Sequence, residues 1–333
     1  MLPMRSSLPA DARADGEFDL IARHFDRPVK RAALGVGDDC ALLAPAPGMQ
    51  LAVSSDLLIE GRHFVSTVAP GRLGHKALAV NLSDLAACGA RPLAFTLALA
   101  LPAVEGAWLA AFSQGLFALA DAHGCELVGG DTTRGPLAIC ITVFGEVPTG
   151  QALLRSGARA GDEVWVSGSV GDARLALEVL RGGVALDGDG FERARAAMER
   201  PEPRVALGLA LRGTATSAID VSDGLLGDLG HVLARSGTGA TLDVDAVPRS
   251  ALLAAQPVER QREYALAGGD DYELLFTAPP AAAGAVRAAG AQAATKVTRI
   301  GRIDAEPGLR LVDARGAAVA HTYASFDHFR TPG

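Results

Sequence analysis

The sequence predicts a two-domain protein of mixed α/β and α+β class. Its 333 residues exceed the usual length of one domain and suffice for two. Hydrophobic residues make up 49% of the chain, mostly in short runs of Ala, Leu and Val that Gly, Pro or charged residues interrupt, the pattern of alternating helices and strands. Pro, Gly, Ser and Arg accumulate at 148–161, so we place the domain boundary there.

The first predicted domain covers residues 16–148 and follows a mobile tail at residues 1–15. Within its second predicted helix, Asn81 and Asp84 lie three residues apart and so share one face, which makes a polar patch on a helix of otherwise buried character. The spacing of apolar residues predicts helices at 17–25, 72–88 and 108–123, and strands at 51–55, 93–101, 126–128 and 137–147. Residues 35–43 are predicted to run from a glycine turn into a strand-like segment.

The second predicted domain covers residues 149–333 and also mixes helices with strands. In both halves aspartates follow strand ends directly, as in open α/β sheets that bind ligands at the carboxyl ends of their strands. The patterns predict helices at 172–180, 192–200, 204–211 and 224–235, and strands at 162–167, 218–221, 241–244, 272–277 and 296–303.

Composition argues against several classes of protein. The net charge is -7 and no cluster of Lys and Arg occurs, which disfavours nucleic-acid binding. The longest apolar run, 94–104, falls short of the ~20 residues of a membrane helix, and the first residues lack the apolar segment of a signal peptide. The four cysteines form no CxxC pair, which is typical of reduced thiols and predicts a cytoplasmic protein.

Aspartates beside Gly or Ser are the most informative feature of the chain. Glycine permits tight turns, and a short carboxylate on such a turn can reach a hard cation such as Mg²⁺ with little loss of side-chain entropy. Zinc would require His and Cys at ligand spacing, and a calcium-binding EF-hand would require DxDxDG, and neither occurs. The six sites are Asp38 and Asp39 in GDD, Asp56 in SSD, Asp84 in NLSD, Asp131 in GGDTTRGP, Asp220 and Asp223 in DVSDG, and Asp270 and Asp271 in GGDDYE.

Each of these motifs taken alone could be an ordinary Asx turn or helix N-cap. In DVSDG, however, Asp220, Ser222 and Asp223 occur together where a cap needs only one such residue. The common nucleotide motifs are missing, because no GxxxxGK[ST], HRD or DFG occurs and Cys40 stands where GxGxxG requires its third glycine. Phosphate chemistry in this chain would therefore need carboxylate-held metals on a different scaffold.

The ordered motifs resemble those of the thiamine-monophosphate kinase family, within the superfamily of aminoimidazole ribonucleotide synthetase. The resemblance covers nearly the whole chain, from Gly16 to Phe329. It is carried by GEFDLIARHF, GVGDDCALL, NLSDLAACGA, GGDTTRGP, DVSDGLLGDLGH and GGDDYELLFT. It implies a two-domain aminoimidazole ribonucleotide synthetase-like (PurM-like) fold, a homodimer whose N-terminal strands pair across subunits, and transfer of the γ-phosphoryl group of ATP to thiamine monophosphate.

The same resemblance implies roles for individual residues. Several Mg²⁺ ions would be held by Asp39, Ser54, Ser55, Asp56, Asp84, Asp131, Asp220 and Asp223. The nucleotide would be contacted by Gly130, Asp131, Arg155 and Ser222, and the thiamine substrate by His63, Asp270 and Phe326. The family usually has Glu where this chain has Asp270, so a direct contact could be lengthened or bridged by water here.

Two alternatives stay open at this point. Another ATP-using enzyme of the superfamily, such as aminoimidazole ribonucleotide synthetase, selenophosphate synthetase or a hydrogenase-maturation protein, would share the fold but not the acceptor. A selenophosphate synthetase would carry a reactive Cys or selenocysteine near its N-terminus, and the tail here has no Cys. A non-catalytic regulator would bind Mg·ATP without turning it over.

Overall fold

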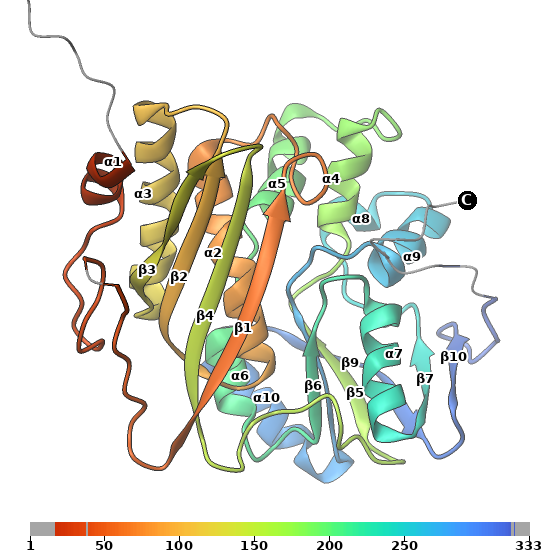
Figure 1. Ribbon diagram of the computed structural model, residues 1–333. Coiled ribbons are helices and arrows are strands. Elements are labelled where there is room, and N and C mark those ends of the chain that lie inside the picture. The colour runs from red at the N-terminus through yellow and green to blue at the C-terminus, as the bar shows by residue number, and fades with distance from the viewer. Residues whose placement is uncertain (1–16, 38, 321–322, 324–333) are drawn as a thin grey trace, which may run out of the picture.

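The computed structural model describes residues 17–37, 39–320 and 323, and contains one β-sheet in each half of the chain (Figure 1). Helices pack against both sheets, so the predicted mixed α/β and α+β class is confirmed. Within the described part of the chain, no helix has both the length and the apolar character needed to cross a bilayer.

The first sheet has the strand order β1-β4-β2-β3, with β4 antiparallel to both neighbours and β2 parallel to β3. Helices α2 and α3 lie behind this sheet in Figure 1, and no helix lies in front of it. The short helix α1 lies beside α3. The bounds are α1 Glu17–His24, β1 Met49–Ile59, α2 Pro70–Ala87, β2 Arg91–Leu101, α3 Gly106–His123, β3 Glu126–Arg134 and β4 Ala138–Pro148.

The second sheet has the order β10-β7-β9-β5-β8-β6, in which β10 and β7 are parallel and the other neighbours antiparallel. Its strands are β5 Glu163–Ser167, β6 Ser217–Asp220, β7 Gly239–Asp243, β8 Leu274–Ala278, β9 Val297–Asp304 and β10 Gly308–Val312. The helices of this half are α4 Asp172–Leu180, α5 Gly188–Glu199, α6 Val205–Leu211, α7 Leu225–Ser236, α8 Ala251–Ala254, α9 Val258–Ala267, the 3-10 helix η1 Pro280–Ala282 and α10 Ala283–Gln292.

Helix α2 is the element that joins the two halves. Most of its side chains are buried, including four polar ones, and a single hydrophobic core extends from its leucines to residues of the second half such as Leu207 and Phe276. Gly74 allows α2 and α3 to pack backbone against backbone. A Cβ added at Gly74 would lie 2.1 Å from the carbonyl oxygen of Phe112, and such an atom cannot be accommodated. Polar residues of α2 are therefore fixed at a rigid junction.

Two strand predictions were too short. β1 continues through Asp56 to Ile59, because all of its residues pair with β4, so Asp56 lies within a strand rather than after one. β3 continues through Gly129 and Gly130 to Arg134, because it pairs in parallel with β2. A Cβ at Gly130 would lie 1.8 Å from the carbonyl oxygen of Leu97, so this glycine permits the close approach of the two strands rather than ending one.

The predicted strand-like segment within 35–43 is wrong. The described residues of this range form a loop, in which Leu42 makes an isolated bridge with Leu34. Side chains rather than a neighbouring strand hold the chain around it: Glu126 accepts hydrogen bonds from the N–H groups of residues 30–32, and Glu146 accepts one from Ala46. The strand at 308–312 and the helices α8, α9 and α10 were not predicted.

Candidate active site

Two polar side chains near the C-terminal end of α2 face β1. Asp84 accepts a short hydrogen bond from the hydroxyl of Ser54. The Asn81 side-chain oxygen accepts a hydrogen bond from the backbone N–H of Asp56 at 3.1 Å, and its amide donates to the Ala77 carbonyl at 3.0 Å. Because β1 is an edge strand, Asn81 satisfies an N–H that no neighbouring strand takes. The shared face of Asn81 and Asp84 that the sequence predicted is thus the face that holds Asp56.

The same helix also reaches the turn between β6 and α7. Asp220 ends β6 and is 4% exposed, and it accepts a hydrogen bond from the Ser83 hydroxyl at 2.7 Å. The turn that follows is closed by Asp228, which accepts hydrogen bonds of 3.0 to 3.1 Å from the backbone N–H groups of residues 222–224. Asp228 was not among the predicted site residues. The available signal was an acidic residue in the first turn of a predicted helix, where it can accept bonds from free N–H groups.

The pKa values show that these carboxylates lie within electrostatic range of one another. Burial, together with the charges of Asp84 and Asp223, raises the pKa of Asp56 to about 6. Burial and the charges of Asp84 and Asp228 raise the pKa of Asp220 to about 8, although the Ser83 hydrogen bond opposes the shift. Like charges that share a poorly solvated region favour binding of a proton or of a cation. The fold therefore brings together aspartates that are separated by more than 160 positions along the chain.

Arg155 approaches this group from the segment that links the two sheets. Its positive charge lowers the pKa of Asp84, against the larger raising effect of burial. The segment is fixed to the end of α2, because the Leu153 N–H donates to the Cys88 carbonyl at 3.0 Å. Arg155 itself is exposed. It can therefore offer its charge both to Asp84 and to an anionic ligand.

Asp131 does not join these carboxylates within one chain. It lies on β3, at the opposite edge of the sheet from β1. The cross-strand register runs from Leu57 through Cys140 and Ala98 to Asp131, and residues in one such row project from the same face of a sheet. Leu57 is exposed on the face away from α2. Asp131 therefore projects from the opposite face to Asp56.

Ser55 and Asp39 are also apart from the carboxylates around α2. Strand alternation turns Ser55 to the outer face, where its hydroxyl lies 2.9 Å from that of Thr142. Asp39 is exposed in the loop that replaces the predicted strand. Across the described residues, no three His, Cys, Asp or Glu side chains stand close enough together to hold a metal ion as they are arranged. The predicted magnesium ligands are thus divided between the group around α2, the outer face of the first sheet with Ser55 and Asp131, and the loop with Asp39.

Of the predicted substrate residues, His63 and Asp270 lie outside the helices and strands. His63 follows β1, and its Nδ1 accepts a hydrogen bond from the Ile59 N–H at 2.9 Å, which in the neutral ring places the proton on Nε2. Asp270 forms an ion pair with Lys76 of α2 at 2.5 Å. Phe326 and Asp38 lie outside the described residues.

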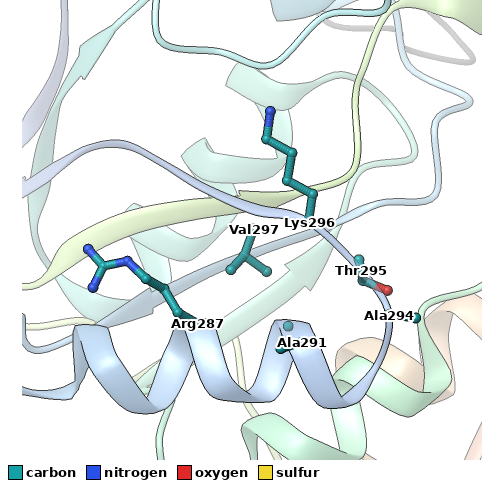
Figure 2. Close-up of a pocket in the computed structure, with 7 residues that line it drawn as sticks. Arg287, Ala291, Ala294, Thr295, Lys296 and Val297 are labelled. Atoms are coloured by element: carbon teal, nitrogen blue, oxygen red, sulfur yellow. The ribbon is translucent and has the colours of Figure 1, made fainter.

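An open pocket of about 380 Å³ lies elsewhere, between α10 and the start of β9 (Figure 2). Its lining includes Arg287 and Lys296 but none of the predicted site residues. Figure 2 shows these two cationic side chains pointing away from each other, so they do not converge on one anion. The Arg287 guanidinium instead lies 5.7 Å from the centre of the Trp165 ring. The candidate active site is therefore defined by the carboxylates around α2 and not by this pocket.

Comparison with known proteins matches each half of the chain to a protein-family model. The model of the AIR synthase related protein N-terminal domain matches residues 37–147, and that of the AIR synthase related protein C-terminal domain matches residues 159–314. The thiamine-monophosphate kinase of Salmonella typhimurium is 46% identical over 327 residues, which cover 96% of this chain and 100% of the relative.

Solved structures agree with this assignment. The crystal structure of thiamine-monophosphate kinase from Stenotrophomonas maltophilia has a TM-score of 0.82 and 46% identity, covering 90% of this chain and 95% of that chain. A structure described as AaThiL complexed with AMPPCP and TMP has a TM-score of 0.74 and 29% identity, covering 86% of this chain and 89% of that chain. The predicted resemblance and the PurM-like fold are confirmed, and the chain belongs to the thiamine-monophosphate kinase family.

Proposed function

We propose that this protein transfers the γ-phosphoryl group of ATP to thiamine monophosphate and so forms thiamine diphosphate. Membership of the family supports the reaction, and the related chain complexed with AMPPCP and TMP supports ATP and thiamine monophosphate as the two substrates. The observation that carries the proposal is that one buried helix, α2, makes hydrogen bonds to β1 and to Asp220 at the end of β6, and so keeps Asp56, Asp84 and Asp220 within electrostatic range of one another. Carboxylates placed in this way could bind the cations that phosphoryl transfer needs.

The donor set of this group fits Mg²⁺. It offers carboxylate and hydroxyl oxygens. A cation would offset the burial and the mutual repulsion that raise the pKa values of Asp56 and Asp220. We propose that several ions are held by Asp56, Asp84, Asp220, Asp223 and Ser54, together with Asp39, Ser55 and Asp131. When bound, Mg²⁺ would offset the negative charge of the phosphate oxygens.

Repulsion between two anions is the main obstacle in the proposed reaction. A phosphate monoester has a second pKa near 6, so at neutral pH the acceptor oxygen is mostly deprotonated and no strong general base is needed. Two like charges about 4 Å apart oppose each other by about 4 kcal/mol at an effective dielectric constant of about 20. The fixed charge of Arg155 acts against this repulsion. We therefore propose direct in-line transfer, without a phosphoenzyme.

The remaining predicted contacts are part of the same proposal. Gly130, Asp131, Arg155 and Ser222 would contact the nucleotide, and His63, Asp270 and Phe326 the thiamine substrate. Two features support the position of Ser222 near a phosphate: Asp228 orders its turn, and the turn follows the buried Asp220.

We also propose that the chain forms the expected homodimer, in which N-terminal strands pair across subunits, and that the outer face of the first sheet lies in its interface. Leu51, Val53, Leu57 and Ile59 alternate along β1 and are 41 to 56% exposed, which makes an apolar surface on an edge strand. A partner on this face would cover the side that carries Ser55 and Asp131. The divided set of magnesium ligands could then be completed between two subunits.

Replacing Val53 by lysine is expected to disrupt this dimer, because a charge would have to be desolvated in the interface. Sedimentation equilibrium should show a dimer for the unchanged protein and a monomer for V53K. The matched control is V104K, since Val104 is 52% exposed on the loop between β2 and α3. A V53K protein that stays dimeric would contradict the proposed interface.

The domain division at 16–148 and 149–333 remains our proposal. In its favour, the first sheet takes all its strands from residues 49–148 and the second from residues 163–312. The shared core around α2 predicts that the two units unfold together rather than separately.

A coupled assay of ADP release tests the proposed function. We expect turnover with Mg·ATP only when thiamine monophosphate is present, with thiamine diphosphate formed in equal amount to ADP. Aminoimidazole ribonucleotide precursors and selenide serve as alternative substrates. Turnover with one of these and not with thiamine monophosphate would replace the proposal by another reaction of the superfamily, and binding of ATP without any turnover would indicate a regulator.

A further inference from the structure

Lys76 is a buried cation on α2 that none of the predicted site roles includes. The residue is 2% exposed, and its Nζ donates to the Asp270 carboxylate at 2.5 Å and to the Met198 carbonyl at 2.9 Å. A buried lysine without a carboxylate partner would be strongly unfavourable. The position of Lys76 therefore depends on Asp270, and the position of the Asp270 side chain depends on Lys76.

The loop that carries Asp270 has an unusual backbone. Asp270 and Tyr272 have φ angles of 62° and 54°, in the left-handed region that non-glycine residues rarely adopt. The loop lies directly against the β6–α7 turn, because the Asp270 N–H donates to the Ser222 carbonyl at 2.7 Å and a Cβ on Gly269 would lie 2.7 Å from the same oxygen. Left-handed residues of this kind persist where surrounding contacts fix them and concentrate at functional sites.

The neighbouring side chains of the loop have structural partners on the second half. Asp271 accepts a hydrogen bond from the Gly171 N–H at 2.8 Å, and Glu273 pairs with Arg204 through two hydrogen bonds of 2.6 and 2.7 Å. The Asp270 side chain differs, because it is 34% exposed and turns toward α2. A carboxylate can accept about four hydrogen bonds, so Asp270 can bind Lys76 and still accept from a ligand.

We propose that Lys76 is a positioning residue that fixes Asp270 for contact with the thiamine end of the acceptor. This inference rests on the proposed function, in which Asp270 contacts that substrate. Lys76 and Asp84 lie eight residues apart on one helix, about 12 Å along its axis. The acceptor-binding loop and the magnesium ligands are thus held by the same rigid element, which sets the distance between acceptor and phosphoryl donor.

A double-mutant cycle tests this role with the variants K76Q, K76M, D270N and K76M/D270N, each in the full-length protein. K76Q keeps a hydrogen-bond donor for Met198 and Asp270 without the charge, so it is the milder change if K76M folds poorly. We expect K76M to raise the KM for thiamine monophosphate by at least about 10-fold, K76Q to raise it less, and the KM for ATP to change by less than about 2-fold. We expect the double variant to bind thiamine monophosphate no more weakly than D270N, because Lys76 acts through Asp270.

The other outcomes overturn the inference in distinguishable ways. If the effects of K76M and D270N multiply, Lys76 acts independently of Asp270. If K76M raises the KM values for both substrates equally, its role is general packing rather than positioning of the acceptor loop. If the unchanged protein does not phosphorylate thiamine monophosphate, the proposed function fails before the cycle applies; if it does and both Lys76 variants match it, only the inference about Lys76 fails.

Discussion

Replacing Asp84 by asparagine is expected to lower kcat/KM for thiamine monophosphate by at least about 100-fold and to leave the fold intact. Asparagine has nearly the same shape and can still accept the hydrogen bond from Ser54. It cannot supply the negative charge that Asp84 directs toward both Asp56 and Asp220. Because Asp84 contributes to the pKa values of both neighbours, its charge should matter for every cation that the group holds.

The matched control for D84N is D121N. Asp121 lies on α3 in an exposed ion pair with Arg27, and such pairs contribute little to stability. We expect D121N to match the unchanged protein in kcat/KM, and circular dichroism to show that D84N unfolds at a temperature no lower than D121N, because the charge of Asp84 is itself disfavoured by burial. A folded D84N protein with full activity would show that the reaction does not depend on the carboxylates around α2.

Replacing Asp220 by asparagine is expected to stabilise the ligand-free protein while removing its activity. Burial and the neighbouring charges raise the pKa of Asp220 to about 8, so the folded state accommodates the neutral form better than the carboxylate. Asparagine is neutral at every pH and can still accept from Ser83. A stabilised but inactive variant is the expected sign of a site in which charges are kept for function at the expense of stability.

The sign of the pH dependence follows from the same shift. Between pH 3.8, the ordinary pKa, and about pH 8, the folded state holds a proton that the unfolded state releases. The free energy of unfolding of the ligand-free protein should therefore fall as pH rises through this window. By calorimetry in EDTA, we expect Tm of D220N to exceed that of the unchanged protein by several degrees at pH 8.5 and by much less at pH 4.5. If the difference in Tm between D220N and the unchanged protein were the same at both pH values, the explanation by the charge of Asp220 would be contradicted.

Sequence patterns predicted the elements of this fold where periodicity was strong. α2 and α4 were found within two residues of their bounds, because their apolar positions recur at helical spacing. The missed extension of β1 has a clear cause. Its inner face carries Ser54 and Asp56, which interrupt the apolar alternation. Only tertiary pairing with β4 and the hydrogen bond that the Asp56 N–H donates to Asn81 make that stretch a strand.

The site could be predicted as a set of residues but not as an arrangement. The motif NLSD indicated a polar face, yet nothing in the spacing showed that Ser83 would turn the other way, toward Asp220. Lys76 and Asp228 were missed because single charged residues on a helix usually lie on its solvated side. The partner of Lys76 lies 194 positions away along the chain, and the partners of Asp228 lie 4 to 6 positions away. Only the fold shows which residues these partners are.

Equilibrium dialysis with Mn²⁺ in place of Mg²⁺, in the presence of a non-hydrolysable ATP analogue and thiamine monophosphate, tests whether these distant aspartates share cations. We predict more than one tightly bound Mn²⁺ per chain in the unchanged protein and in D121N, and fewer in D84N and D220N. The same stoichiometry and affinity in all four proteins would show that the aspartates brought together by α2 do not hold the metal.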